Sequence, residues 1–127
     1  KWNIYMVALA DCSFYVFSYL MNEKGLKDND CKKIYLNIIK NEKENGLSDK
    51  IYEKAKKEFL QRYDKVDFKN HYLENPFQES CSALYHWAPI ADELKDLDKK
   101  IVLNSMSLKW NLIIDEFKKS TKNLNFN

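Results

Sequence analysis

Hydrophobic and polar positions repeat with helical spacing over most of the chain, starting with an apolar run at residues 2–22. This run holds no Gly or Pro and only one charged residue, Asp11, and it predicts a first helix. A step of about 100° per residue places Asp11, Ser18 and Asn22 on a narrow polar stripe. The stripe separates one apolar face, with Tyr5, Ala8, Leu9, Cys12, Val16 and Tyr19, from another, with Val7, Ala10, Phe14, Phe17 and Met21. We expect Cys12 to point into the most apolar surface of this helix.

Further helices follow from local start and stop signals. The second is predicted from about Asp30, and Gly46 is placed to end it. Ser48 can cap a third helix, and residues 64–74 predict a short mixed segment with a turn of helix. A fourth helix is predicted over residues 76–88, because a proline occupies its first position after a capping asparagine.

The last predicted helix is long, running from Pro89 to about Thr121, with residues 103–107 as a candidate interruption. It carries two apolar stripes, one with Ile90, Leu94, Leu97, Ile101, Leu108 and Leu112, the other with Leu103, Met106, Trp110, Ile114 and Phe117. The first helix is itself apolar on nearly every side. Together with both stripes it offers more apolar surface than a small helical core should need. Either these surfaces are covered within one core, the interpretation we favour, or one face contacts a partner. The candidate interface comprises Val7, Phe14, Phe17, Met21, Met106, Trp110 and Phe117.

Composition supports an all-α fold, a single compact bundle of about five helices forming one domain over residues 1–127. The 127 residues include only two Gly and two Pro, so few residues are suited to tight turns. Apolar residues make up 45% of the chain. The net charge is +2, and Arg62 is the only arginine among the 21 basic residues. Nucleic-acid binding is not expected, because a phosphate-binding surface uses arginine forks and a patch of one sign.

The first helix also has the length of a membrane span, with aromatic residues that could lie at the interfaces. A span is not expected, because Asp11 would lie near the bilayer centre at a cost of about 2.5 to 3.5 kcal/mol on insertion scales. No basic cluster flanks the run.

The residues that could carry chemistry do not form a known pattern. The Cys and His residues lack the paired spacing of zinc ligands, so we expect no metal, and no cofactor is predicted for His71 or His86. Cys81 and His86 are five positions apart, about 140° around a helix, and cannot act together as nucleophile and base within it. Asp11 would raise the pKa of the Cys12 thiol, which disfavours a reactive thiolate. An enzyme is therefore not expected.

The three cysteines have two structural interpretations. Cys12, Cys31 and Cys81 are all predicted on inward helix faces, where they could be buried thiols or any two could be bridged. A bridge between Cys12 and Cys81 is preferred, because it would join the first helix to the fourth and close a long loop, for a stabilisation of roughly 4 kcal/mol.

A cysteine in the first helix, in "ALADCSFY", and a second after two further helices, in "ESCSALY", resemble small exported helical proteins of bacteria, most of them without an assigned function. The resemblance covers residues 5–88. It implies a periplasmic or secreted location, with the cytoplasm as the alternative, and a disulfide between Cys12 and Cys81; Cys31 departs from the pattern. The chain starts at Lys1, which we interpret as removal of an upstream segment by processing or by truncation.

Three functional hypotheses follow. The leading one is a non-enzymatic protein-interaction module, such as an accessory subunit, adaptor or inhibitor, with a protein partner or a second copy as its ligand. The alternative is a carrier of an apolar small molecule or cofactor in the bundle interior, in a pocket lined by the aromatic residues of the first, fourth and last helices. The third is an enzyme that uses His86 or Asp11 in a site assembled from distant residues, which would require an open cleft reaching either residue.

Overall fold

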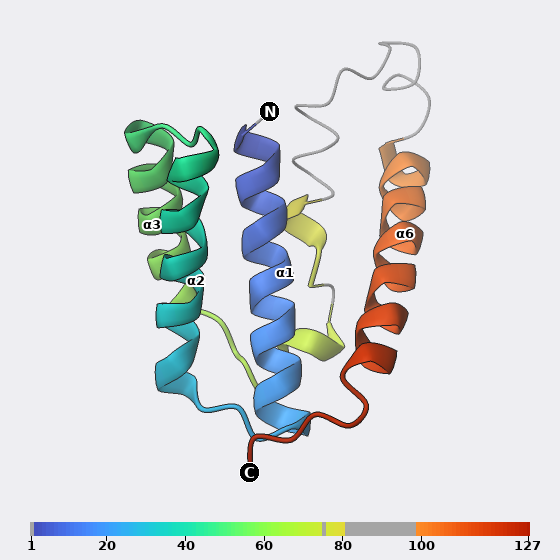
Figure 1. The fold of residues 1–127 in the computed structure, drawn as a ribbon. Helices are drawn as coiled ribbons and strands as arrows, with labels where there is room; N and C mark the ends of the chain where they lie inside the picture. The colour runs from blue at the N-terminus through green and yellow to red at the C-terminus, as the bar shows by residue number, and fades with distance from the viewer. Residues whose placement is uncertain (1, 75, 81–98) are drawn as a thin grey trace.

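The computed structural model of the chain describes residues 2–74, 76–80 and 99–127, the stretch 99–109 by its backbone alone. The described residues are helical and contain no strand, which confirms the predicted all-α class (Figure 1). The elements are α1 (Trp2–Glu23), α2 (Asp28–Glu42), the 3-10 turn η1 (Lys43–Asn45), α3 (Asp49–Tyr63), the 3-10 turn η2 (His71–Leu73) and α6 (Lys99–Ser120).

Several helix ends lie where the local signals predicted them. The Ser48 side chain accepts a hydrogen bond from the backbone N–H of Ile51 at 3.3 Å, so it caps α3. Gly46 has φ of 103°, a left-handed conformation that ends η1 and that side chains with a Cβ adopt only at a cost. The second helix begins at Asp28, two residues before its predicted start.

The described core lies where α2 and α3 pack on one side of α1. Phe14 of α1 is fully buried and stacks on Phe59 of α3, with ring centroids 5.0 Å apart. Tyr35 of α2 stacks on the same Phe59 ring at 3.7 Å, so three helices meet at one aromatic side chain. Phe68, from the segment after α3, adds a fourth ring 6.1 Å from Phe14.

The buried face of α1 differs from the predicted one. Phe14 and Phe17 are 0% and 3% exposed, whereas Tyr5 on the expected inward face is 42% exposed and Cys12 is half-buried. The prediction was wrong because both faces are apolar, and hydrophobic periodicity cannot tell which of two apolar faces the neighbouring helices will cover.

The C-terminal helix α6 lies on the other side of α1 from α2 and α3 (Figure 1). Phe117 of α6 packs edge-on against Tyr15 and Tyr19 of α1, with centroids 5.6 and 5.4 Å apart. Its backbone is helical throughout 103–107, so the candidate interruption is absent, and its expected start at Pro89 lies outside the described residues.

The chain end then returns to the C-terminal end of α1. The backbone N–H of Phe126 donates to the carbonyl of Lys24 at 2.7 Å.

Candidate functional site

The polar stripe of α1 holds the irregular segment that follows α3. Ser18 donates from Oγ to the carbonyl of Phe68 at 2.6 Å and accepts from the N–H of Tyr72 at 3.0 Å. Asn22 donates to the same Phe68 carbonyl at 2.8 Å. Backbone groups outside regular structure need such partners when they are shielded from water. The stripe predicted from helical spacing therefore serves to attach residues 68–72 to the first helix.

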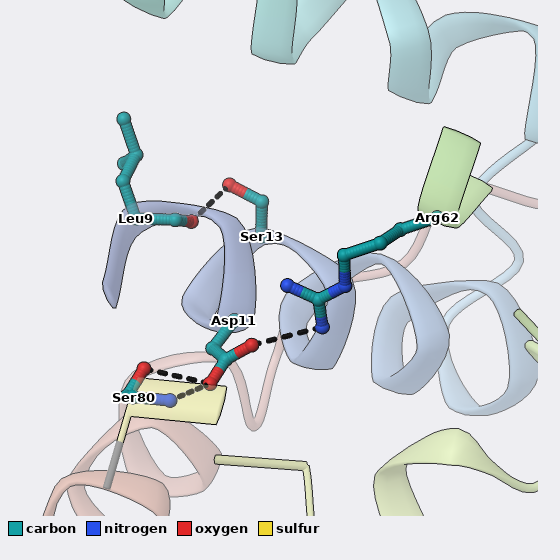
Figure 2. A network of polar contacts seen from close by, with 5 residues as sticks. All are labelled: Leu9, Asp11, Ser13, Arg62 and Ser80. Carbon is teal, nitrogen blue, oxygen red and sulfur yellow. Dashed lines mark hydrogen bonds and ion pairs between the residues drawn. The ribbon is translucent and has the colours of Figure 1, made fainter. Parts of the chain in front are cut away.

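Asp11, on the same stripe, is the centre of a buried polar network (Figure 2). Its side chain is 0% exposed, and one carboxylate oxygen accepts from Nη2 of Arg62 at 2.9 Å. The other oxygen accepts from the backbone N–H and from the hydroxyl of Ser80, at 2.6 and 2.7 Å. Residues 78–80 are helical, so this carboxylate binds an N–H at a helix start, where a negative charge is favourable. The network joins α1, α3 and Ser80.

Arg62 has a second contact besides the ion pair. Its guanidinium carbon lies 4.6 Å from the centre of the Phe14 ring, so the planar group covers an aromatic side chain of the core. The Arg62 side chain keeps 30% exposure. Arginine, unlike lysine, has a flat group that can stack on a ring and donate hydrogen bonds in a fixed direction. This difference accounts for the chain's one arginine at this position.

The exposed part of Arg62 borders a pocket of about 400 Å³. Its lining comprises Arg62, His71, Glu74, Pro76, Gln78 and Glu79. The buried Nε2 atom of His71 has no hydrogen-bond partner among the residues that the structure describes. The pKa of His71 is lowered, first by burial and then by the positive charge of Arg62, so the imidazole is neutral at pH 7.

The cysteines within the described residues are not activated. The pKa of Cys12 is raised to about 11, first by burial and then by the charge of Asp11, in the direction expected from the sequence. The pKa of Cys31 is also raised to about 11, by burial and by Asp28 and Asp30. Both groups are thiols at neutral pH, which disfavours nucleophilic chemistry.

No disulfide joins Cys12 to Cys31. Cys81 and His86 lie outside the described residues, so the bridge from Cys12 to Cys81 stays a prediction that non-reducing peptide mapping of the native protein would test.

Most of the predicted interface residues contact this chain instead. Phe14 and Phe17 are core residues, so their assignment to an interface was wrong. Met21 packs against the core, and Val7 borders a small pocket between α1, α2 and α3. Trp110 stacks on Phe77 with centroids 4.3 Å apart, Phe117 packs on α1, and the side chain of Met106 is outside the description.

Within the part of the chain that is described, no group of three or more His, Cys, Asp or Glu residues is arranged to hold a metal ion. One described helix, α1, is long and apolar enough to cross a membrane, with a mean hydropathy of 1.5 over a stretch that is 50% buried inside the chain. A core helix of a soluble protein and a signal sequence have the same properties.

Neither Arg62 nor Ser80 was predicted as a site residue from the sequence. They lie 51 and 69 positions from Asp11 in the sequence, so no local spacing connects them. The available signal was compositional: a single arginine among 21 basic residues, on a helix whose other basic residues are lysines.

Comparisons of the chain with protein-family models, with curated proteins and with solved structures find no match. The function of the protein is therefore inferred from the geometry of this chain.

Proposed function

We propose that the protein is a helical protein-binding module, a single bundle whose contact surface lies on the outward face of α6. The observation that carries the proposal is the exposure of two adjacent large apolar side chains in the middle of a helix. Leu112 is 67% exposed and Ile113 is 51% exposed. Their neighbours Trp110 and Phe117 already contact this chain through Phe77, Tyr15 and Tyr19.

This arrangement supports the expectation of surplus apolar surface, but the exposed surface lies on the other stripe of α6 from the one in the candidate interface. The stripe that contains Trp110 and Phe117, first assigned to a partner, faces this chain, and Leu112 of the other stripe is exposed. Burying a leucine or isoleucine side chain is worth about 1.5 to 3 kcal/mol. A partner that covers both residues would therefore gain useful binding energy on a helix that is already held in place.

The alternative of an apolar-ligand carrier has less support among the described residues. The pocket between α1, α2 and α3, bordered by Met6, Ala10 and Phe59, holds about 40 Å³. Sites for small molecules are about 300 to 1,000 Å³ in volume. This pocket is therefore too small for such a ligand, whereas a larger pocket of about 290 Å³ is lined by Phe77, Trp110 and Ile114 together with polar side chains.

The test is a pair of double variants on α6. Leu112→Asp with Ile113→Asp introduces two charges on the proposed surface, whereas Asn111→Asp with Ser120→Asp introduces the same two charges at exposed polar positions. Complex formation would be measured by native mass spectrometry, and by crosslinking and capture from an extract of the source, with helix content checked by circular dichroism.

We expect the unchanged chain and the Asn111/Ser120 variant to form the same complex, with a second copy or with a defined protein, and the Leu112/Ile113 variant to lose it. A monomeric unchanged chain that captures no protein would contradict the proposal. Equal loss of binding in both double variants would contradict it as well.

A further inference from the structure

The pocket beside Arg62 presents charged groups of both signs that are not paired with one another. Arg62 forms an ion pair with Asp11, and no other ion pair involves it within the described chain. Glu74 and Glu79 line the same pocket, are exposed, and form no ion pair with Arg62. A ligand with one group of each sign would find a counterpart for both.

Arg62 is held in a fixed orientation at this pocket. The Asp11 carboxylate accepts a hydrogen bond from Nη2 alone, and the Phe14 ring packs against one face of the guanidinium. Among the described residues, the other terminal nitrogen of the guanidinium forms no hydrogen bond. A guanidinium has five N–H donors in a planar fork that matches the geometry of a carboxylate. The ion pair with Asp11 uses one side of this fork, so the remaining N–H groups can donate to a second acceptor.

The imidazole of His71 also lies in the lining of this pocket. Its Nε2 atom is fully buried, so a ligand in the pocket would contact other atoms of the ring. Gln78 supplies a further donor and acceptor in the lining.

We propose that this pocket binds a small zwitterion of the size of an amino acid or a dipeptide. The carboxylate of the ligand binds the free side of the Arg62 fork, and its ammonium group binds Glu74 or Glu79. The volume of about 400 Å³ lies in the range of small-molecule sites. The polar lining, in which Pro76 is the apolar member, suits a hydrophilic ligand. This proposal is independent of the proposed protein-binding surface on α6 and uses none of its residues.

A plain cation site and a plain anion site fit less well. A ligand with an ammonium group alone would face the positive charge of Arg62. It would also offer no acceptor for the N–H donors of the guanidinium. A ligand with a carboxylate alone would meet the charges of Glu74 and Glu79 and would be repelled.

The binding test uses the full chain with the twenty common L-amino acids and glycylglycine, each measured by isothermal calorimetry and by chemical-shift changes in labelled protein. Each probe that binds is then compared with its analogue lacking the amine and with its analogue lacking the carboxylate. We expect at least one saturable ligand, and binding about tenfold weaker or more for both single-charge analogues.

Variants assign that binding to the pocket. Arg62→Lys keeps a positive charge near Asp11 but removes the fork, and Glu74→Gln with Glu79→Gln removes the negative charges from exposed positions. The matched control is Glu44→Gln with Glu53→Gln, two exposed glutamates outside the lining. We expect a loss of about tenfold or more in the first two variants and none in the control.

The Glu74/Glu79 variant keeps the test decisive if Arg62→Lys fails to fold. The proposal is overturned if no probe binds below about 10 mM, a limit near −2.7 kcal/mol. It is overturned equally if binding persists in the Glu74/Glu79 variant, or if the amine alone binds as tightly as the zwitterion.

Discussion

At the scale of single residues, Arg62 and Asp11 connect the hydrophobic core with a buried charge. Asp11 has no exposed surface and is tolerated because three donors bind its two oxygens. Arg62 in turn covers the Phe14 ring. The pair is better understood as a device that positions α1, α3 and Ser80 than as a large source of stability, because desolvation offsets much of the attraction in a buried ion pair.

Removing one partner of this pair should be costly. In Asp11→Ala the guanidinium of Arg62 loses its counter-ion and the N–H of Ser80 loses its acceptor. We expect the free energy of unfolding to fall by about 3 kcal/mol, the lower end of the range for broken buried pairs, because Arg62 retains 30% exposure. Urea denaturation followed by circular dichroism measures this change.

The control for this prediction is Glu53→Ala, an exposed acidic residue on α3 that should change stability by no more than about 0.5 kcal/mol. Equal effects of Asp11→Ala and Glu53→Ala would refute the role assigned to the network.

At the scale of elements, the helices begin and end through short local contacts, while their neighbours are chosen by side-chain networks. Ser48 and Gly46 mark the boundary between η1 and α3 with a capping hydrogen bond and a left-handed backbone. The polar stripe of α1, by contrast, acts over a distance, since Ser18 and Asn22 bind backbone groups about 50 residues further along the chain.

The cap of α3 gives a prediction at this scale. Ser48→Ala removes the acceptor for the N–H of Ile51 and should lower the free energy of unfolding by about 1 kcal/mol. Ser48→Asp retains an acceptor at the same place and should restore most of the loss. Thermal and urea denaturation of the two variants supply the measurement, and an Asp variant as unstable as the Ala variant would argue against capping as the cause.

At the scale of the whole molecule, three helices each contribute a tyrosine whose neutral form the fold requires. The pKa of Tyr15 on α1 is raised to about 12, first by burial and then by nearby Tyr19. Those of Tyr35 on α2 and Tyr63 on α3 are also raised, mainly by burial, and Tyr63 donates to Asp28 as well. A phenol whose folded pKa exceeds its unfolded pKa binds its proton more tightly in the native state.

The packing of α1, α2 and α3 should therefore weaken in alkali. The contribution of these tyrosines is fully present below their ordinary pKa of 10.0 and is lost as the pH rises above it toward the folded values. Denaturation midpoints below and above pH 10 measure the loss. The loss should be smaller in Tyr35→Phe, which keeps the ring that stacks on Phe59 but has no proton to release. An identical pH dependence in Tyr35→Phe and the unchanged chain would count against this explanation.

Features of the fold that depend on residues close together in the sequence were predictable, and those that depend on contacts between distant helices were not. The helical class came from composition and helical spacing, the cap at Ser48 from a local start signal, and the polar stripe of Asp11, Ser18 and Asn22 from spacing within one helix. The structure contains each of them. The buried side of α1 was predicted wrongly, and residues 103–107, a candidate interruption, are helical. Both depend on which neighbours pack against the helix, and intrinsic preferences are weak beside such packing.

The sequence by itself determined that this chain forms helices, where several of them begin, and that one carboxyl group must lie within an apolar surface, because these properties depend on neighbours three or four positions away. Only the tertiary structure decided what that carboxyl group binds. Asp11 meets Arg62 and Ser80, and the pocket of Arg62, His71 and Glu74 forms, because α3 and the segment after it fold back onto α1 across more than 50 residues of chain.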